Sequence, residues 1–166
     1  MNLIHRYYCR SNHWRRHLQG LLQWATEDVD LTGADVLEFG SGPGLSTDWL
    51  RHRVGSLTAV EYDAYDALAL ARRLPDVRVA HSDASELPFP AASFDVVVCF
   101  TMLHHVPGRR RQDRLLSEAH RVLRPGGLFA AATADPARCS RSPISETTCW
   151  WWTPPSFPSG WPLSGS

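Results

Sequence analysis

The sequence predicts an α/β protein built on a doubly wound, mostly parallel β-sheet. Short apolar runs alternate with helix-like segments between residues 34 and 138. Glycines gather directly after the first of these runs, and residues 94–100 hold three consecutive valines, as is typical of a strand buried on both faces. Strands that alternate with helices pair in parallel through right-handed crossovers, and this pattern sets the fold class.

Five apolar runs account for the strands of this sheet. They cover residues 36–39, 57–60, 77–80, 94–100 and 127–133. Helices are expected over residues 46–53, 64–74 and 110–123; the second is stopped by Pro75 and the third carries an apolar stripe. The chain therefore contains one sheet domain, which we place at residues 34–138.

A helical lead segment, residues 1–33, precedes the sheet domain. Trp14, Leu18, Leu21 and Leu22 recur at the spacing of one helical face. This face predicts a helix that docks on the core, and the same helix could also act as a lid over a substrate pocket. Both interpretations can hold together.

Residues 139–166 form a tail of different composition. It holds five prolines, seven serines and four of the seven tryptophans, without a helical or alternating period. We expect this tail to be poorly ordered and to contain no strand, which would leave residues 127–133 as an exposed sheet edge. The abrupt change is interpreted as a truncation or a frameshift.

Composition limits the possible partners. The 17 basic residues balance 17 acidic ones, so a nucleic-acid partner is disfavoured. The longest apolar run is too short to cross a bilayer, and no secretory signal precedes it, so we expect no membrane partner and a cytoplasmic location. The four cysteines form no C-x-x-C pair, so no metal site is predicted. Cys99 lies in an apolar run and is expected to be a buried apolar residue.

The glycine loop at residues 40–44 is the most informative stretch. Gly40, Gly42 and Gly44 follow a strand and precede a helix, where the backbone can turn sharply and a ligand can approach closely. Glu61 ends the next strand, 21 residues after Gly40, where a carboxylate can accept hydrogen bonds from ribose hydroxyls. Together these residues predict a nucleoside-containing ligand.

Two residues favour S-adenosylmethionine over NAD as that ligand. Leu45 stands where the dinucleotide fingerprint needs a small residue. Glu38, inside the first strand, places a carboxylate that suits an amino group and a sulfonium better than a pyrophosphate. An NAD-binding Rossmann oxidoreductase remains the less favoured alternative.

Residues 34–136 resemble the class I S-adenosylmethionine-dependent methyltransferases, in their small-molecule branch. The resemblance is carried, in the family's order, by residues 36–44, 57–63, 81–84, 87–89, 93–95, 103–106 and 123–127. It implies a Rossmann-like sheet with strand order 3-2-1-4-5. The family's usual last two strands, an antiparallel pair, are missing from the pattern, so a non-catalytic remnant or subunit that only binds the cofactor stays an alternative.

The resemblance also implies roles for single residues. Gly40, Gly42 and Gly44 would line the methionine end together with Ser41, and Glu38 would support the amino group. Glu61 would bind the ribose, and Tyr62 would lie against the adenine. Asp83 would accept from the adenine amine, with the Ala84 N–H beside the ring, while Phe100 and Thr101 would face the cofactor and the acceptor.

The acceptor is predicted to be a small molecule. Residues 100–103 read Phe-Thr-Met-Leu, where the amino-group methylases of DNA carry an [Asn/Asp]-Pro-Pro-[Tyr/Phe] motif. His104 or His105 could be the base that takes a proton from the acceptor, although packing or capping explains these histidines more simply. The methylated atom and the oligomeric state are left open.

Overall fold

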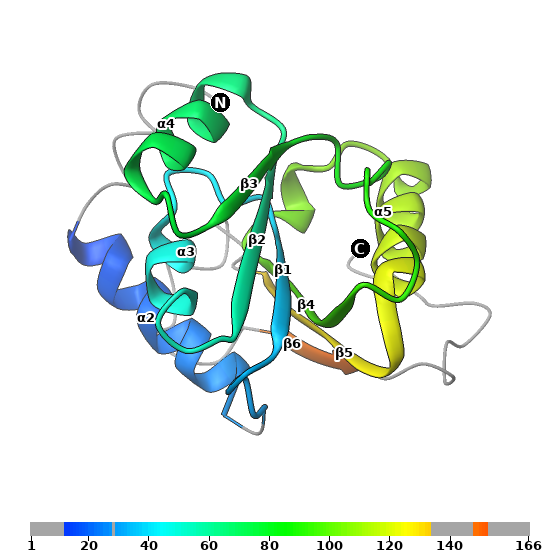
Figure 1. Ribbon diagram of the computed structural model, residues 1–166, viewed down its shortest axis with the longest axis horizontal. Helices are drawn as coiled ribbons and strands as arrows, with labels where there is room; N and C mark the ends of the chain where they lie inside the picture. Colours follow the sequence, from blue (N-terminus) through cyan, green and yellow to red (C-terminus); the bar gives the residue numbers. More distant parts are fainter. Residues whose placement is uncertain (1–11, 28, 134–147, 153–166) are drawn as a thin grey trace.

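The computed structural model describes residues 12–27, 29–133 and 148–152. Figure 1 shows a twisted sheet with helices on both faces. The elements are α2 (Asn12–Ala25), β1 (Asp35–Phe39), α3 (Leu45–Leu50), β2 (Ser56–Glu61), α4 (Ala64–Arg73), β3 (Arg78–His81), β4 (Phe94–Phe100), the 3₁₀ turn η1 (Leu103–His105), α5 (Arg109–Val122), β5 (Leu123–Thr133) and β6 (Thr148–Trp152).

The sheet has the order β3-β2-β1-β4-β5-β6. The five predicted strands are all present, and every pair among them is parallel. Val36 lies at the centre, between Leu57 of β2 and Val96 of β4. The predicted order 3-2-1-4-5 is thus confirmed.

The sixth strand corrects the expectation that no strand follows Thr133. β6 pairs antiparallel with β5, with Trp150 opposite Ala131, so it covers the edge that we expected to be open. The tryptophan run at residues 150–152 favours extended structure, and the prolines at 143 and 154 fall outside the strand. The expected lack of order concerns residues 134–147 and 153–166 as well, and these lie outside the described residues.

Helices cover the two faces of the sheet unequally. α2, α3 and α4 pack on one face, where their apolar side chains join those of Val36, Leu57 and Val98. α5 and the loop before β4 pack on the other face, against Leu37, Val97 and other strand residues. Figure 1 shows this division, with α5 set apart from the other three helices.

The lead helix α2 docks on the core, as its periodicity predicts. Leu18, Leu21, Leu22 and Ala25 are buried in the same apolar cluster as β1. Trp14, one turn before them, is half-buried. The docking interpretation is confirmed, and the lid interpretation stays a prediction.

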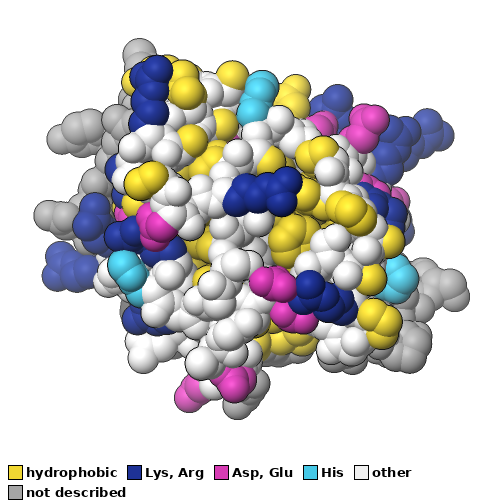
Figure 2. Space-filling model, viewed as in Figure 1, with side chains coloured by type: hydrophobic (Ala, Val, Ile, Leu, Met, Phe, Trp, Pro, Cys, Tyr) yellow, Lys and Arg dark blue, Asp and Glu magenta, His cyan; other side chains and the backbone are white. Residues whose placement is uncertain are grey.

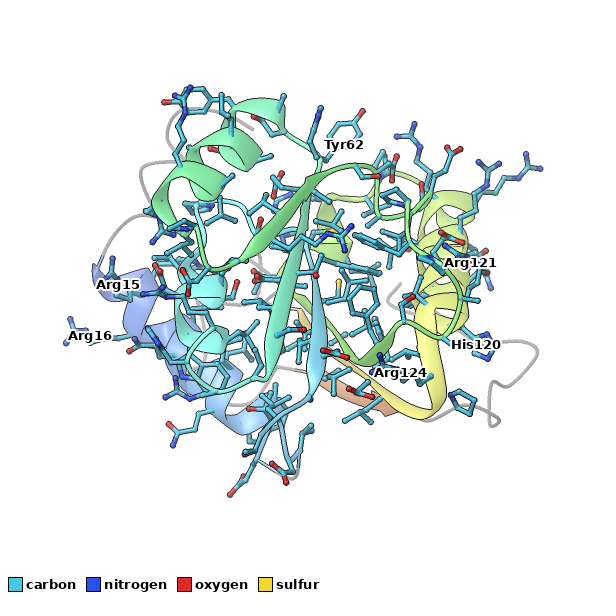
Figure 3. The ribbon with its side chains drawn as sticks, viewed as in Figure 1. Arg15, Arg16, Tyr62, His120, Arg121 and Arg124 are labelled. Atoms are coloured by element: carbon cyan, nitrogen blue, oxygen red, sulfur yellow. The ribbon has the colours of Figure 1, made fainter. Side chains whose placement is uncertain are left out.

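Charged side chains hold the amino ends of the strands together, opposite the glycine loop. Arg124 of β5 contacts Asp35 of β1 at 2.9 Å and Asp95 of β4 at 2.7 Å. Asp35 also accepts a hydrogen bond from Ser56 of β2. The Ser56 hydroxyl and then Arg124 lower the pKa of Asp35, and Arg124 foremost lowers the pKa of Asp95. This cluster, with Arg124 labelled in Figure 3, joins four strands.

Candidate functional site

The glycine loop connects β1 to α3 at the carboxyl end of the sheet. Gly40, Gly42 and Gly44 have φ angles of 69°, 51° and 82°. A residue with a Cβ atom is strained in this left-handed region of backbone conformation, so the path of the loop requires glycine at these three positions. The predicted sharp turn is therefore confirmed.

Packing adds a second reason for two of these glycines. A side chain at Gly40 would strike Met102, and one at Gly44 would strike Leu70 and Arg73. At Gly42, by contrast, a Cβ atom would meet nothing within 4 Å. The open side of the loop therefore lies at Gly42, while Gly40 and Gly44 face protein side chains.

Ser41 carries a buried hydroxyl that has no hydrogen-bond partner among the described residues. Its side chain is 4% exposed. Leaving a buried hydroxyl unsatisfied costs about 1–3 kcal/mol, so such groups in native proteins call for an explanation. A polar ligand at the glycine loop would supply the missing partner, and the donor set therefore fits a cofactor with a polar tail.

Glu61 is joined directly to the loop. One carboxylate oxygen accepts a hydrogen bond from the Gly42 N–H at 2.7 Å, and the other accepts from the Asp63 N–H at 2.9 Å. The residue is 8% exposed. The structure thus brings together the two features that predict a nucleoside site, the glycine loop and the acid at the end of β2.

Tyr62 follows Glu61 and projects at the edge of the molecule, as Figure 3 shows. It is 69% exposed, more than Tyr65 at 66% and Trp24 at 48%, the other exposed aromatic residues of the described part of the chain. Asp63 then caps α4 by accepting from the N–H groups of Tyr65 and Asp66. An exposed ring beside a fixed acid could form one wall for a flat base.

Asp83 lies in the loop after β3, next to buried Ala84. One oxygen of Asp83 accepts from the N–H and the hydroxyl of Ser85, at 2.8 and 2.7 Å. Burial acts to raise the pKa of Asp83, but these hydrogen bonds and the charge of Arg111 outweigh it and lower the pKa. Asp83 is therefore an ionised acceptor at neutral pH.

Two residues of α5 hold the loop that follows Asp83. Arg121 donates to the carbonyl oxygens of Phe89 at 2.8 Å and Leu87 at 3.3 Å. Glu118 accepts from the Leu87 N–H at 2.8 Å and pairs with Arg121 at 2.7 Å. Figure 3 labels Arg121 on the side of α5. This pair fixes the loop to α5.

The carboxyl end of β4 presents Phe100 and Thr101. Phe100 is 4% exposed and packs in the core cluster under α2 and α3. Thr101 has a φ of 53°, a strained value for a residue with a branched side chain, and its N–H donates to the Ala132 carbonyl at 2.7 Å. Strain of this kind is often found at functional sites. Thr101 directly follows β4, and its contact with the cofactor and the acceptor stays a prediction.

Glu38 is buried and hydrogen-bonded within the protein. It is 1% exposed, and its two oxygens accept hydrogen bonds from the hydroxyls of Ser46 and Thr47 on α3. Burial raises the pKa of Glu38 to about 7, against the effect of these hydrogen bonds. Glu38 therefore ties β1 to α3 beneath the loop, and its contact with a cofactor amino group stays a prediction.

His104 and His105 lie on η1, directly after Thr101 and Met102. Both are exposed, and their rings lie 4.0 Å apart at an angle of 43°. Their proposed role as a base stays a prediction. The part of the chain that the structure describes contains no group of three or more potential metal ligands, and it contains no helix long and apolar enough to span a membrane.

Several contacts of the site could not be found from the sequence. Ser46 and Thr47 bind Glu38, Met102 packs on Gly40, and Arg73 binds the glycine loop. For Ser46 and Thr47 the sequence offered one weak signal, which is their position at the start of α3, directly after the glycine loop. Arg73 and Met102 had none, because each is brought to the loop from a separate element.

Comparison with known proteins agrees with this geometry. Residues 37–131 match a family described as a methyltransferase domain. A probable S-adenosylmethionine-dependent methyltransferase from Mycolicibacterium smegmatis is 35% identical over 137 residues, which cover 82% of this chain and 51% of that protein. A probable phthiotriol/phenolphthiotriol dimycocerosates methyltransferase from Mycobacterium ulcerans is 36% identical over 126 residues, or 74% of this chain and 47% of that protein.

The fold has solved counterparts. The crystal structure of the [4+2]-cyclase SpnF superposes with a TM-score of 0.64 and 23% identity, covering 75% of this chain and 47% of that one. The chain spans about half the length of the relatives it matches. The glycine loop, the acid at the end of β2, the strand order and the family match agree, and the chain belongs to the class I S-adenosylmethionine-dependent methyltransferases.

Proposed function

We propose that this chain binds S-adenosylmethionine across the carboxyl ends of β1, β2 and β3. The hydrogen bond from the Gly42 N–H to the Glu61 carboxylate carries the proposal, because it joins the two parts of a nucleoside site. The buried, unpartnered hydroxyl of Ser41 supports it, since the methionine end of this cofactor offers a polar partner there.

Each predicted residue has a distinct part in holding the cofactor. Glu61 accepts from the ribose hydroxyls, Tyr62 lies against the adenine, and Asp83 accepts from the adenine amine. The lowered pKa of Asp83 supports its part, because only an ionised carboxylate is purely an acceptor. The bound cofactor would supply an activated methyl group on a sulfonium, so the protein's contribution is mainly positioning.

The acceptor is proposed to be a small, apolar molecule. Met102, Leu103 and Val106 present partly buried apolar side chains just beyond β4. The Mycobacterium ulcerans relative is named for phthiotriol/phenolphthiotriol dimycocerosates, which are not nucleic acids or proteins, and this supports a small-molecule acceptor. His104 or His105 would take a proton from the acceptor if its nucleophile needs one.

A nucleic-acid acceptor fits less well. Basic and acidic side chains are interspersed on the face drawn in Figure 2, and the formal net charge is zero. A phosphate backbone is normally bound by a continuous basic surface.

We also propose a cytoplasmic location, which rests on the sequence features alone.

A second candidate function is cofactor binding without methyl transfer. The [4+2]-cyclase SpnF has the same fold and is named for another reaction, so the fold does not by itself specify methyl transfer.

Two measurements separate these candidates. Calorimetric titration with S-adenosylhomocysteine and with NADH should give binding of the first alone; binding of NADH alone would favour the oxidoreductase alternative. Transfer of a labelled methyl group to a panel of apolar hydroxylated acceptors then tests turnover. Tight binding with no labelled product across the panel would favour the non-catalytic candidate.

A further inference from the structure

Arg73 forms an unusual set of contacts with the glycine loop from outside it. One terminal nitrogen of its guanidinium donates to the carbonyl oxygens of Pro43 at 3.0 Å and Gly44 at 3.2 Å. The other contacts both carboxylate oxygens of Asp48, on α3, at 2.7 Å. A single side chain thus holds the second half of the loop and the helix that follows it.

The guanidinium group is suited to this arrangement. Its planar fork can bind a carboxylate with one nitrogen and backbone carbonyls with the other, which the point charge of a lysine cannot do. Gly44 packs so closely on Arg73 and Leu70 that a side chain there would collide with both. The loop therefore has little freedom to move toward α4.

The position of α4 gives these contacts a further consequence. Its first turn begins at Asp63, directly after Glu61 and Tyr62, which serve the adenosine half of the site in the proposed function. Its last turn carries Arg73, which reaches the loop proposed to hold the methionine half. One helix of ten residues thereby spans both halves.

We propose that Arg73 is a positioning residue for the methionine end of the cofactor, acting through the carbonyl groups of Pro43 and Gly44. The inference rests on the proposed function. Without the guanidinium, the loop gains freedom while Glu61, Tyr62 and Asp83 keep their places. Ligands that use the loop should therefore lose affinity, and ligands that use only the adenosine half should not.

Two ligands make this distinction measurable. S-adenosylhomocysteine carries the amino-acid tail, and 5′-methylthioadenosine is the same nucleoside thioether without it. In Arg73→Ala, calorimetry should show about a five- to tenfold loss for S-adenosylhomocysteine and less than about a twofold change for methylthioadenosine, on the scale of a few exposed charged hydrogen bonds. Arg73→Lys should recover only part of the loss.

Arg72→Ala is the matched control. Arg72 is exposed on the same helical turn, and the described residues offer it no recorded hydrogen bond or ion pair. This variant should bind both ligands as the wild type does. Asp48→Asn keeps the contacts of Arg73 with the loop but weakens its ion pair with residue 48. This variant should show a smaller loss of affinity for S-adenosylhomocysteine, and it replaces Arg73→Ala in the test if that variant fails to fold.

Each possible outcome either supports or overturns the positioning role of Arg73. A selective loss of S-adenosylhomocysteine supports the positioning role. An equal loss of both ligands, or no loss of either, overturns it while leaving the proposed function intact. A wild-type chain that binds neither ligand would refute the proposed function itself, and the inference with it.

Discussion

Glu38 allows a sharp test of the structure below the glycine loop. Its carboxyl group is buried between Ser46 and Thr47, and burial raises its pKa from 4.5 to about 7. An acid whose pKa is raised by folding destabilises the folded state once it ionises. Its contribution to the free energy of unfolding is therefore intact below pH 4.5 and is lost as the pH rises toward 7.

The size of this effect follows from the shift. One pKa unit corresponds to about 1.4 kcal/mol, so the full loss is about 3 kcal/mol, of which about 2 to 3 kcal/mol falls between pH 5 and pH 8. Glu38→Gln has no charge to bury and keeps the shape of the side chain. Relative to the wild type, this variant should gain about that much stability as the pH rises over this range.

Urea unfolding of both proteins at pH 5, 6, 7 and 8 measures the difference directly. Histidines and the other carboxyl groups titrate in both chains, so they cancel. Glu86→Gln, at an exposed glutamate, is the control and should follow the wild type at every pH. A difference between Glu38→Gln and the wild type that stays constant from pH 5 to pH 8 would refute the reasoning.

Three further predictions concern the core, the sheet and the ligand. Leu22→Ala should lower the free energy of unfolding by about 2–5 kcal/mol, because the Leu22 side chain of α2 is fully buried in the core. Leu68→Ala, at a half-exposed site, should change it little, and equal effects of the two variants would contradict the docking of α2. Arg124→Gln should lower the melting temperature, since it removes the contacts with two strands, and an unchanged melting temperature would show that the cluster contributes nothing. Tyr62→Ala should leave the melting temperature unchanged but weaken S-adenosylhomocysteine binding by about 1–3 kcal/mol, and unaltered affinity would remove the ring from the site.

The five strands and the main site were predictable because they depend on local patterns, whereas the strand order followed from the resemblance to the methyltransferase family. Apolar runs between helical segments indicated the five parallel strands, and glycine spacing indicated the turn at residues 40–44. The contact between Gly42 and Glu61 then follows from the pairing of β1 with β2, which brings the ends of these strands together.

The remaining features depend on contacts that no local pattern encodes. Arg73 reaches the loop across 29 residues of sequence, and nothing in its neighbours distinguishes it from Arg72. The partners of Glu38 depend on how α3 leaves the loop. β6 was missed because the many prolines of its surroundings masked a short run of tryptophans, and because its pairing with β5 is a long-range contact.

The central claim, that the ends of β1 and β2 form the cofactor site, is tested most directly by one calorimetric comparison. S-adenosylhomocysteine is titrated into the wild type, Glu61→Gln and the exposed control Glu86→Gln. We expect Glu61→Gln to bind about 1.5–3 kcal/mol more weakly, roughly 10- to 150-fold, because Glu61 supplies charged acceptors to the ribose and holds Gly42. Equal affinity in Glu61→Gln and the wild type would contradict the account, since the residue at its centre would then contribute nothing to binding.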